Sequence, residues 1–417
     1  MTGGGNSKKK EKAKVAYVMS RFPHLPETFI LREMSEIEDL GWEVCVYPLI
    51  HQKQHVVHPE AQRFLAKVRY SAFLSIRTMA ANISQCFRDP FRYLRIFTVM
   101  VRGNLSSLKF LHRSLVIFPK AVQMGRKMQA EGVDCIHAHY ATHPALAAWI
   151  INRFFSIPFI VTVHAHDIFV ERAMLYEKLW QAAHIITISD FNRKFLRDRI
   201  GEWVEVKCTT NHCGVFPEKY SSQKESRNGL FSIISTGSLQ PYKGQKYLIE
   251  AARLLMERGV PFRCTIIGAG ELNTSLSAQI QAAGLRERVE LAGPKNEDEV
   301  AAYLKQADCY VQPSIVDRSG KMEGIPVSLM EAMATGVPVI ASSLSGIPEL
   351  VEHNRSGLLV PPGDPDVLAE SIFRLWNDPA LAAELAANGK EVVSAKFNVH
   401  KNAPFVSKLL GRLLHEQ

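Results

Sequence analysis

Residues 323–342, EGIPVSLMEAMATGVPVIAS, are the stretch of sequence that decides the fold. Glu323 and Gly324 precede Pro326, which suits the first turn of a helix because its missing N–H would have no partner there. The helix is expected to run to Gly336, a suitable left-handed stop, and VPVIAS then reads as a buried strand. A helix that begins in this way presents unpaired N–H groups and a partial positive charge, so its start suits a phosphate group.

Two carboxylates flank this expected phosphate site. Glu323 precedes the helix, and Glu331 lies about two turns into it. Carboxylates accept hydrogen bonds from sugar hydroxyls, so the layout suits a ligand with phosphate in the middle and a polyol at each end. A nucleotide-sugar has that form. A glutamate pair with this spacing is also common on solvated helices, so the pair alone does not decide between the two readings.

The letters around the pair resemble the signature of retaining glycosyltransferases of family 4. These letters are EGIP at the front, EAMATG at the back and the following PVIAS. The resemblance implies an α/β protein of the GT-B fold, with two Rossmann-like, doubly wound domains facing across a cleft and a C-terminal helix crossing back. It also implies that Glu323 holds sugar hydroxyls and that Glu331 holds the ribose. The backbone of Gly324, Ile325 and Val327 would then meet the donor diphosphate.

Length and composition favour a soluble protein of two domains. The chain has 417 residues, of which 47% are apolar and 22% charged. Its seven cysteines show no metal-ligand spacing, which is typical of reduced thiols in a cytosolic protein. Residues 145–163 are apolar but are interrupted by Arg153 and Pro158, so they read as a helix, a turn and a strand. We therefore expect neither a signal peptide nor a transmembrane span.

Changes in composition divide the chain into five parts. These are a disordered basic tail (1–13), an N-terminal domain (14–220), a polar linker (221–229), a C-terminal domain (230–395) and a C-terminal helix (396–417). The resemblance to family 4 implies that the N-terminal domain is on the acceptor side, that the C-terminal domain binds the nucleotide-sugar, and that the C-terminal helix packs back on the N-terminal domain.

The excess of positive charge lies in a helical insertion, residues 51–130. Within it, residues 61–130 hold 13 Lys and Arg against one acidic residue, whereas the rest of the chain has 37 basic and 40 acidic residues. Aromatic residues alternate with these cations, a pattern that suits an anionic membrane surface. Nucleic acid and an ordinary solvated helical face are the alternatives. We favour the membrane, expect no nucleic-acid partner, and expect the protein on the cytoplasmic membrane face.

The N-terminal domain offers a histidine at the end of an expected strand. IPFIVTV leads into His164, and alternating strands and helices place functional groups at the carboxyl ends of a parallel sheet. The HAHD stretch is similar to the histidine motif of family 4, which implies that His164 faces the sugar while His166 and Asp167 support it. His137 and His139, at another strand end, are weaker candidates.

The entrance to the N-terminal domain, a strand over 14–20 followed by a loop and the letters ETFI, resembles exopolysaccharide-type members of the family. Thr28 is a suitable N-cap for the helix that follows. Many relatives carry glycines in this loop where the backbone nears the donor phosphate, and here prolines and a histidine replace them. Arg21 and Thr28 are the candidates for loop contacts.

The C-terminal domain begins with a strand into Gly237 and a loop that carries Lys243 and Gly244. The loop resembles the family element whose lysine meets the donor diphosphate. Relatives usually place an arginine after the first glycine, whereas this chain has Ser238. Arg318 or Lys321 could supply the missing charge.

Residues 263–272 include a Gly-Ala-Gly turn, Gly268 to Gly270, that is half of a dinucleotide fingerprint. The third glycine is missing, since Asn273 takes its place, so a nicotinamide site is not favoured. In family 4 this element is a turn beside the nucleotide base. Ser314 is expected at the edge of the site. Gly293 and Lys295 are possible nucleotide neighbours.

The predicted function is retaining transfer of a sugar from a UDP- or GDP-linked donor to a hydroxyl acceptor. The acceptor is expected to be a lipid-linked saccharide in surface or exopolysaccharide assembly. The catalytic candidates are His164, Lys243 and Glu323, with no cofactor and no metal ion, because no Asp-x-Asp element lies in a suitable place. Two alternatives remain: a catalytically weak glycan-binding or scaffold protein of the same fold, and a nicotinamide-dependent oxidoreductase.

Overall fold

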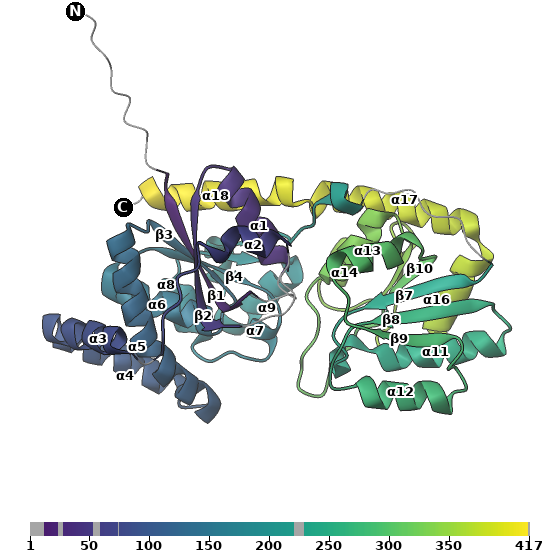
Figure 1. Cartoon of the computed structure of the whole chain (residues 1–417), viewed down its shortest axis with the longest axis horizontal. Coiled ribbons are helices and arrows are strands. Elements are labelled where there is room, and N and C mark those ends of the chain that lie inside the picture. The colour runs from purple at the N-terminus through teal and green to yellow at the C-terminus, as the bar shows by residue number, and fades with distance from the viewer. Residues whose placement is uncertain (1–11, 24–27, 53–58, 74, 221–228, 416–417) are drawn as a thin grey trace, which may run out of the picture.

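Two α/β units lie side by side in the computed structural model, which describes residues 12–23, 28–52, 59–73, 75–220 and 229–415 (Figure 1). Each unit is built on a six-stranded parallel sheet covered by helices. The expected α/β fold with two doubly wound domains is therefore confirmed. The predicted linker 221–229 lies outside the described residues except for Gly229, as does the predicted tail as far as residue 11.

The first sheet has the strand order β2-β1-β3-β4-β5-β6. Its strands are β1 (Lys14–Phe22), β2 (Glu43–His51), β3 (Cys135–His139), β4 (Phe159–Val163), β5 (His184–Thr187) and β6 (Cys208–Thr210). Its helices are α1 (Thr28–Asp39), α2 (Pro59–Leu65), α3 (Ile76–Arg88), α4 (Pro90–Asn104), α5 (Leu108–Glu131), α6 (His143–Phe155), α7 (His166–Phe169), α8 (Leu175–Gln181), α9 (Asp190–Ile200) and α10 (Val204–Lys207).

The second sheet has the strand order β12-β11-β10-β7-β8-β9. Its strands are β7 (Phe231–Thr236), β8 (Phe262–Ile267), β9 (Val289–Gly293), β10 (Cys309–Gln312), β11 (Val339–Ser342) and β12 (Leu358–Val360). Its helices are α11 (Gln245–Glu257), α12 (Asn273–Ala282), α13 (Glu297–Lys305), α14 (Val327–Thr335), α15 (Ile347–Leu350) and α16 (Pro365–Asn377).

These strand orders fix where a ligand can bind. In the first sheet, β2 lies on one side of β1 and all later strands lie on the other side, so the strand order switches between β1 and β3. In the second sheet the same switch lies between β7 and β10. Crossover connections diverge at such a switch point and leave a crevice at the carboxyl ends of the two strands. The loops that follow β3, β7 and β10 therefore carry residues toward one region between the units.

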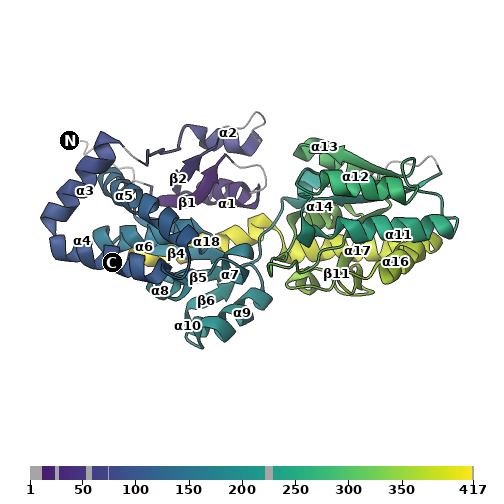
Figure 2. The same ribbon diagram turned by 90° about the horizontal axis from the view of Figure 1, so that it is seen from below.

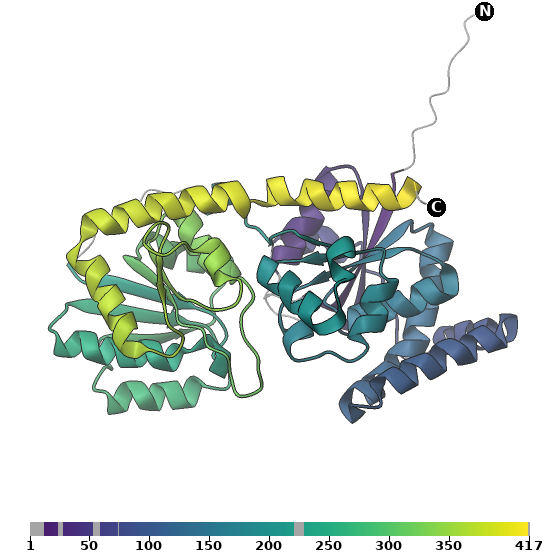
Figure 3. The same cartoon turned by 180° about the vertical axis from the view of Figure 1, so that it is seen from behind.

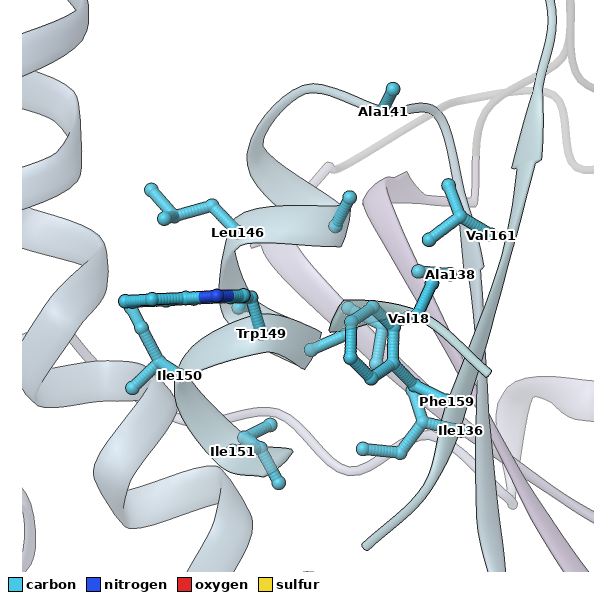
Figure 4. Packing of buried hydrophobic residues seen from close by; sticks show 14 of the residues in the cluster. Val18, Ile136, Ala138, Ala141, Leu146, Trp149, Ile150, Ile151, Phe159 and Val161 are labelled. Atoms are coloured by element: carbon cyan, nitrogen blue, oxygen red, sulfur yellow. The ribbon is translucent and has the colours of Figure 1, made fainter. Parts of the chain in front are cut away.

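Helix α6 shows how the first sheet is covered (Figure 4). Its side chains Leu146, Trp149 and Ile150 are buried in the same cluster as Ile136 of β3 and Phe159 of β4. Every residue of β3 and β4 is buried, as expected for strands of a parallel sheet covered on both faces. This packing holds the ends of both strands, and the histidines there, in fixed positions.

The chain crosses between the units a second time near its end. Helix α17 (Pro379–Lys396) lies on the second unit, and α18 (Val399–His415) continues across the first, where it packs on α1 (Figure 3). At the crossing, Val215 N donates to Phe397 O at 2.9 Å and Val399 N donates to Val215 O at 3.1 Å. The expected C-terminal helix that crosses back is confirmed.

Helices α3 and α4 project from the outer side of the first unit, beyond α5 (Figure 2). The expected aromatic segment is not one continuous surface, because Phe64 and Phe118 are fully buried, whereas Phe87 and Phe91 are each 85% exposed. Helix α5 belongs to the core, where it packs against α6. Within the described residues, no helix combines the length and the apolar character needed to cross a bilayer.

Candidate active site

A cleft of about 510 Å³ lies between the two units, at the carboxyl ends of their sheets. Most of the residues predicted from the sequence line it. They are Thr28, His164, His166, Gly237, Ser238, Lys243, Lys295, Lys321, Glu323, Gly324, Ile325, Val327 and Glu331. The switch-point geometry explains why residues so distant along the chain meet here.

Other predicted residues lie elsewhere among the described parts of the chain. Ser314 is buried, and its hydroxyl accepts a hydrogen bond from Gln312 Nε2 at 2.8 Å. Arg318 is exposed on the loop that follows, and Arg21 lies in a neighbouring pocket. None of these three side chains contributes to the wall of the cleft.

Lys243 and Glu323 form an ion pair in the cleft. Lys243 ends the short turn Pro241–Lys243 after β7, and Glu323 lies in the loop between β10 and α14. Burial disfavours the charged ammonium, but the Glu323 carboxylate beside it raises the pKa of Lys243 above its ordinary value. Lys243 is therefore positively charged in the cleft. Its partner Glu323 could exchange this ion pair for a hydrogen bond from a sugar hydroxyl.

The start of α14 opens into this part of the cleft. Pro326 occupies the N-cap position, with φ −66° and ψ 126°, and no side chain caps the helix. The sequence placed Pro326 inside the first turn, and the structure begins the helix one residue later, at Val327. A Cβ atom on Gly324 would lie 2.8 Å from Ile188 Cδ1 of the first unit, so a larger residue here would displace that side chain.

The glycines of the second unit have a packing role. A Cβ atom on Gly268 would lie 1.9 Å from the carbonyl oxygen of Gly237, and one on Gly270 would lie 2.4 Å from that of Leu239. The two turns are joined by a bond from Leu239 N to Ala269 O of 2.9 Å. Gly268 and Gly270 thus let the loop after β7 lie against the loop after β8, and they are absent from the cleft wall.

Lys321 is a second cation in the cleft. Its ammonium lies 4.2 Å from the ring centroid of Tyr242 and donates to Gln240 Oε1 at 2.6 Å. Burial lowers the pKa of Lys321, and the positive charge of Lys243 acts in the same direction, so the two ammonium groups lie in one electrostatic environment. Of the two substitutes suggested for the missing arginine at Ser238, the structure brings Lys321 into the cleft and leaves Arg318 outside.

Glu331 is held by an arginine that the sequence did not single out. Arg32 of α1 is fully buried, and its Nη2 donates to Glu331 Oε1 at 2.8 Å and to Glu297 Oε1 at 2.9 Å. Tyr220 Oη accepts from the same nitrogen at 2.8 Å. This cluster joins the two units across the cleft and orients one oxygen of Glu331.

Three buried histidines and Glu33, whose side chain is 18% exposed, form a close set on the first unit. His164 Nε2 lies 3.3 Å from His139 Nδ1, and His139 Nε2 lies 3.3 Å from Glu33 Oε1. His137 Nδ1 is 3.2 Å from the same oxygen, which also accepts from Tyr17 Oη at 3.0 Å. The sequence pointed to the histidines but gave no signal for Glu33.

The next question is which of these four side chains carry a charge. Burial opposes its ionisation, but His137 and His139 hold the pKa of Glu33 well below its ordinary value. Burial lowers the pKa of His164, so its imidazole is neutral at pH 7. The ligand atoms of Glu33, His137 and His139 lie within 4.8 Å of one another and could hold a metal ion.

Asp167 fixes the backbone that carries His164. Its carboxylate accepts from the backbone N–H groups of Ala141 at 2.8 Å, Ala165 at 2.8 Å and His164 at 3.1 Å. His166 lies 3.6 Å from Glu171 through Nε2 and remains 44% exposed in its side chain. Asp167 thus supports His164 through the main chain, and His166 lies at the rim of the cleft.

Two doubly wound units facing across a cleft, with a C-terminal helix that crosses back, define the GT-B class of glycosyltransferases. The family model of glycosyl transferases group 1 matches residues 217–392, and that of glycosyltransferase family 4 matches residues 27–219. The amylovoran biosynthesis glycosyltransferase AmsK of Erwinia amylovora is 30% identical over 96% of this chain and 100% of its own. The chain belongs to glycosyltransferase family 4 and is a glycosyltransferase.

Other relatives agree with this assignment. The putative colanic acid biosynthesis glycosyltransferase WcaL of Escherichia coli (strain K12) is 29% identical over 92% of this chain and 96% of its own. The crystal structure of Anabaena Alr3699/HepE in complex with UDP-glucose gives a TM-score of 0.72 at 16% identity, covering 96% of this chain and 99% of that one. At that identity the likeness concerns the fold.

Proposed function

We propose that the protein transfers a sugar, with retention of anomeric configuration, from a UDP- or GDP-linked donor to a hydroxyl of a lipid-linked saccharide. The observation that carries this proposal is the ion pair of Lys243 and Glu323 beside the uncapped start of α14, with His164 in the wall of the same cleft. The arrangement offers a cation and backbone N–H groups to a diphosphate and a carboxylate to sugar hydroxyls.

The chemical problem is a developing positive charge at the anomeric carbon beside a departing diphosphate. Lys243, Lys321 and the free N–H groups at the start of α14 stabilise the negative charge that grows on the leaving group. Glu323 exchanges its bond with Lys243 for bonds to the sugar, and Glu331, oriented by Arg32, accepts from the ribose. A phosphate oxygen of the donor takes the acceptor proton on the face from which the diphosphate departs.

The acceptor proposal rests on relatives and on the outer surface of the first unit. The relatives AmsK and WcaL are named for the biosynthesis of amylovoran and colanic acid, which favours a role in exopolysaccharide assembly. Helix α3 carries an exposed apolar stripe at helical spacing, formed by Ile76, Met79, Ile83 and Phe87. Exposed arginines on α3 and α4 accompany it, so these helices suit the anionic cytoplasmic face of a membrane.

The test is a screen of UDP-, GDP- and ADP-sugars for thermal stabilisation and for transfer to saccharide acceptors. A ligand that binds the native state raises its melting temperature. We expect one donor class to stabilise the wild-type protein, and Lys243→Ala to abolish both the shift and turnover. Lys246→Ala, an exposed lysine on α11, serves as the matched control and should change neither.

Other outcomes separate the alternatives. Donor stabilisation without transfer or hydrolysis would favour a glycan-binding or scaffold protein, for which the uncharged Ser238 is the supporting feature. A lack of stabilisation by every nucleotide-sugar, together with tight NAD binding by fluorescence, would contradict the transferase proposal.

A further inference from the structure

One glutamate and two histidines bring three metal-ligating atoms together inside the first unit. Glu33 comes from α1, and His137 and His139 come from the end of β3. Their ligating atoms all lie within 4.8 Å of one another. Both imidazoles are buried, and none of the three residues lines the cleft. The set is therefore enclosed by the fold, unlike a group of carboxylates on an open surface.

The separations between these atoms match those of a metal site. His137 Nδ1 lies 3.2 Å from Glu33 Oε1, and His139 Nε2 lies 3.3 Å from the same oxygen. Ligands that lie about 2.0–2.1 Å from a tetrahedral zinc ion are separated from one another by about 3.4 Å. One ion can therefore be bound by these atoms with small rotations of the side chains.

The set also contains a buried atom that needs a partner. Within the described parts of the chain His137 Nδ1 makes no hydrogen bond, although it lies 3.2 Å from Glu33 Oε1. A buried polar atom without a partner costs free energy. No lysine or arginine among the described residues pairs with Glu33. A cation at this place would satisfy both the nitrogen and the carboxylate.

The second nitrogen of each imidazole has a neighbour that can accept. His137 Nε2 lies 2.7 Å from Thr162 Oγ1, and His139 Nδ1 lies 3.3 Å from His164 Nε2. Histidines that bind metal ions almost always donate their other N–H to an acceptor, which fixes the ring and its tautomer. Coordination through His139 Nε2 displaces the proton that this atom otherwise donates to Glu33. The remaining N–H, on Nδ1, then donates to His164.

We propose that Glu33, His137 and His139 bind one zinc ion, which joins α1 to the end of β3. Two imidazoles and a carboxylate suit zinc, whereas magnesium prefers oxygen ligands alone. Three protein ligands leave a fourth position for water. Arg32, the neighbour of Glu33 on α1, holds Glu331 across the cleft, so the ion also stabilises the helix that orients this carboxylate. The ion lies apart from the diphosphate site, for which the sequence predicted no metal.

The first experiment measures metal binding without any sugar donor. Full-length protein, freed of metal ions with a chelator and dialysed, is titrated with zinc chloride in a calorimeter. We expect one equivalent of zinc to bind and to raise the melting temperature, and magnesium chloride to do neither at the same concentrations. Cobalt(II) serves as a spectroscopic probe. One equivalent should give the visible absorption of a cobalt–imidazole complex of low coordination number, and zinc should displace it.

Variants then identify the ligands. Glu33→Gln keeps the size of the side chain and removes its charge, so it should weaken zinc binding by about a hundredfold or more and abolish the cobalt spectrum. Thr162→Val removes only the acceptor behind His137 and should weaken zinc binding by about tenfold, as expected for a group that orients a ligand. His184→Gln, at the start of β5 and so at the opposite end of the sheet, is the matched control and should change neither.

Two results would overturn the inference. One is the lack of a saturable zinc site in the wild-type protein. The other is equal zinc affinity of wild type and Glu33→Gln, as binding to surface histidines would give. Each variant should melt cooperatively in the presence of chelator, and if Glu33→Gln does not, Thr162→Val and the cobalt spectrum of the wild type decide. No donor or acceptor is present, so neither result bears on the proposed glycosyl transfer.

Discussion

At the scale of single residues, we expect Lys321 to affect donor affinity more than any other residue after Lys243. Ser238 removes a cation that relatives usually carry, and Lys321 lies in the cleft beside Lys243, whereas Arg318 is exposed outside it. We expect Lys321→Ala to weaken donor binding by about tenfold, the scale of one charge-assisted hydrogen bond. Arg318→Ala is the matched control and should stay within about twofold. Equal effects in calorimetric titrations with the stabilising donor would contradict this assignment.

Glu33 sets the tautomers of the histidine set. Its carboxylate can only accept hydrogen bonds, so His139 carries a proton on Nε2 and donates it to Glu33. His139 Nδ1 is then unprotonated and accepts a hydrogen bond from His164 Nε2–H. We expect Glu33→Gln to lower kcat by about tenfold or more and to change the pH profile of kcat, with the donor KM nearly unchanged. Steady-state kinetics across pH measure this. A parallel loss of donor-induced stabilisation would instead indicate a general structural defect.

The residues that the sequence revealed and those it missed differ in a physical way. His164, Lys243 and Glu323 follow strands, and a parallel sheet brings the carboxyl ends of its strands together, so local reading was sufficient. Arg32 meets Glu331 across 299 residues of chain and from another unit. The periodicity of the α1 sequence predicts which residues form its apolar face, but it does not predict the partner of Arg32. The pairing of a charged residue buried between two units leaves no local trace in the sequence.

At the scale of elements, the exposed stripe of α3 and the adjoining start of α4 carry the membrane proposal. Phe87 and Phe91 are each 85% exposed. We expect Phe87→Asp/Phe91→Asp to reduce binding to vesicles of phosphatidylglycerol and phosphatidylethanolamine by about tenfold or more, because apolar burial is lost and two like charges are added near an anionic surface. Vesicle sedimentation measures the change.

The control for this experiment lies on another face of the same unit. Val206 of α10 is 90% exposed, and Val206→Asp should leave vesicle binding unchanged. Both variants should retain donor-induced stabilisation. Vesicle binding that is equal for all three proteins would contradict a role for α3 and α4 at the membrane. The sequence predicted the charge of this region, but only the structure separates its buried aromatics from its exposed ones.

At the scale of the whole molecule, buried neutral histidines make stability depend on pH. The pKa of His143 is lowered to about 4 in the folded state, so between its unfolded value near 6.5 and about 4 the unfolded chain binds the extra proton. The contribution of His143 to the free energy of unfolding is therefore fully present above pH 6.5. It falls as the pH drops toward 4, by at most about 1.4 kcal/mol per pH unit. Urea unfolding at pH 7.0 and 5.5 should show the loss, with a smaller loss in His143→Gln. An identical dependence in both proteins would contradict it.

The chain passes between the two units twice. Val215, before the first crossing, is hydrogen bonded to Phe397 and Val399 at the second, and α18 then completes the surface of the first unit against α1. The first unit is thus made from both ends of the chain and the second unit from its middle. A chimera that exchanges donor specificity with a relative should therefore graft an internal cassette and keep the native tail, since a simple head-to-tail fusion would leave α1 facing a foreign helix.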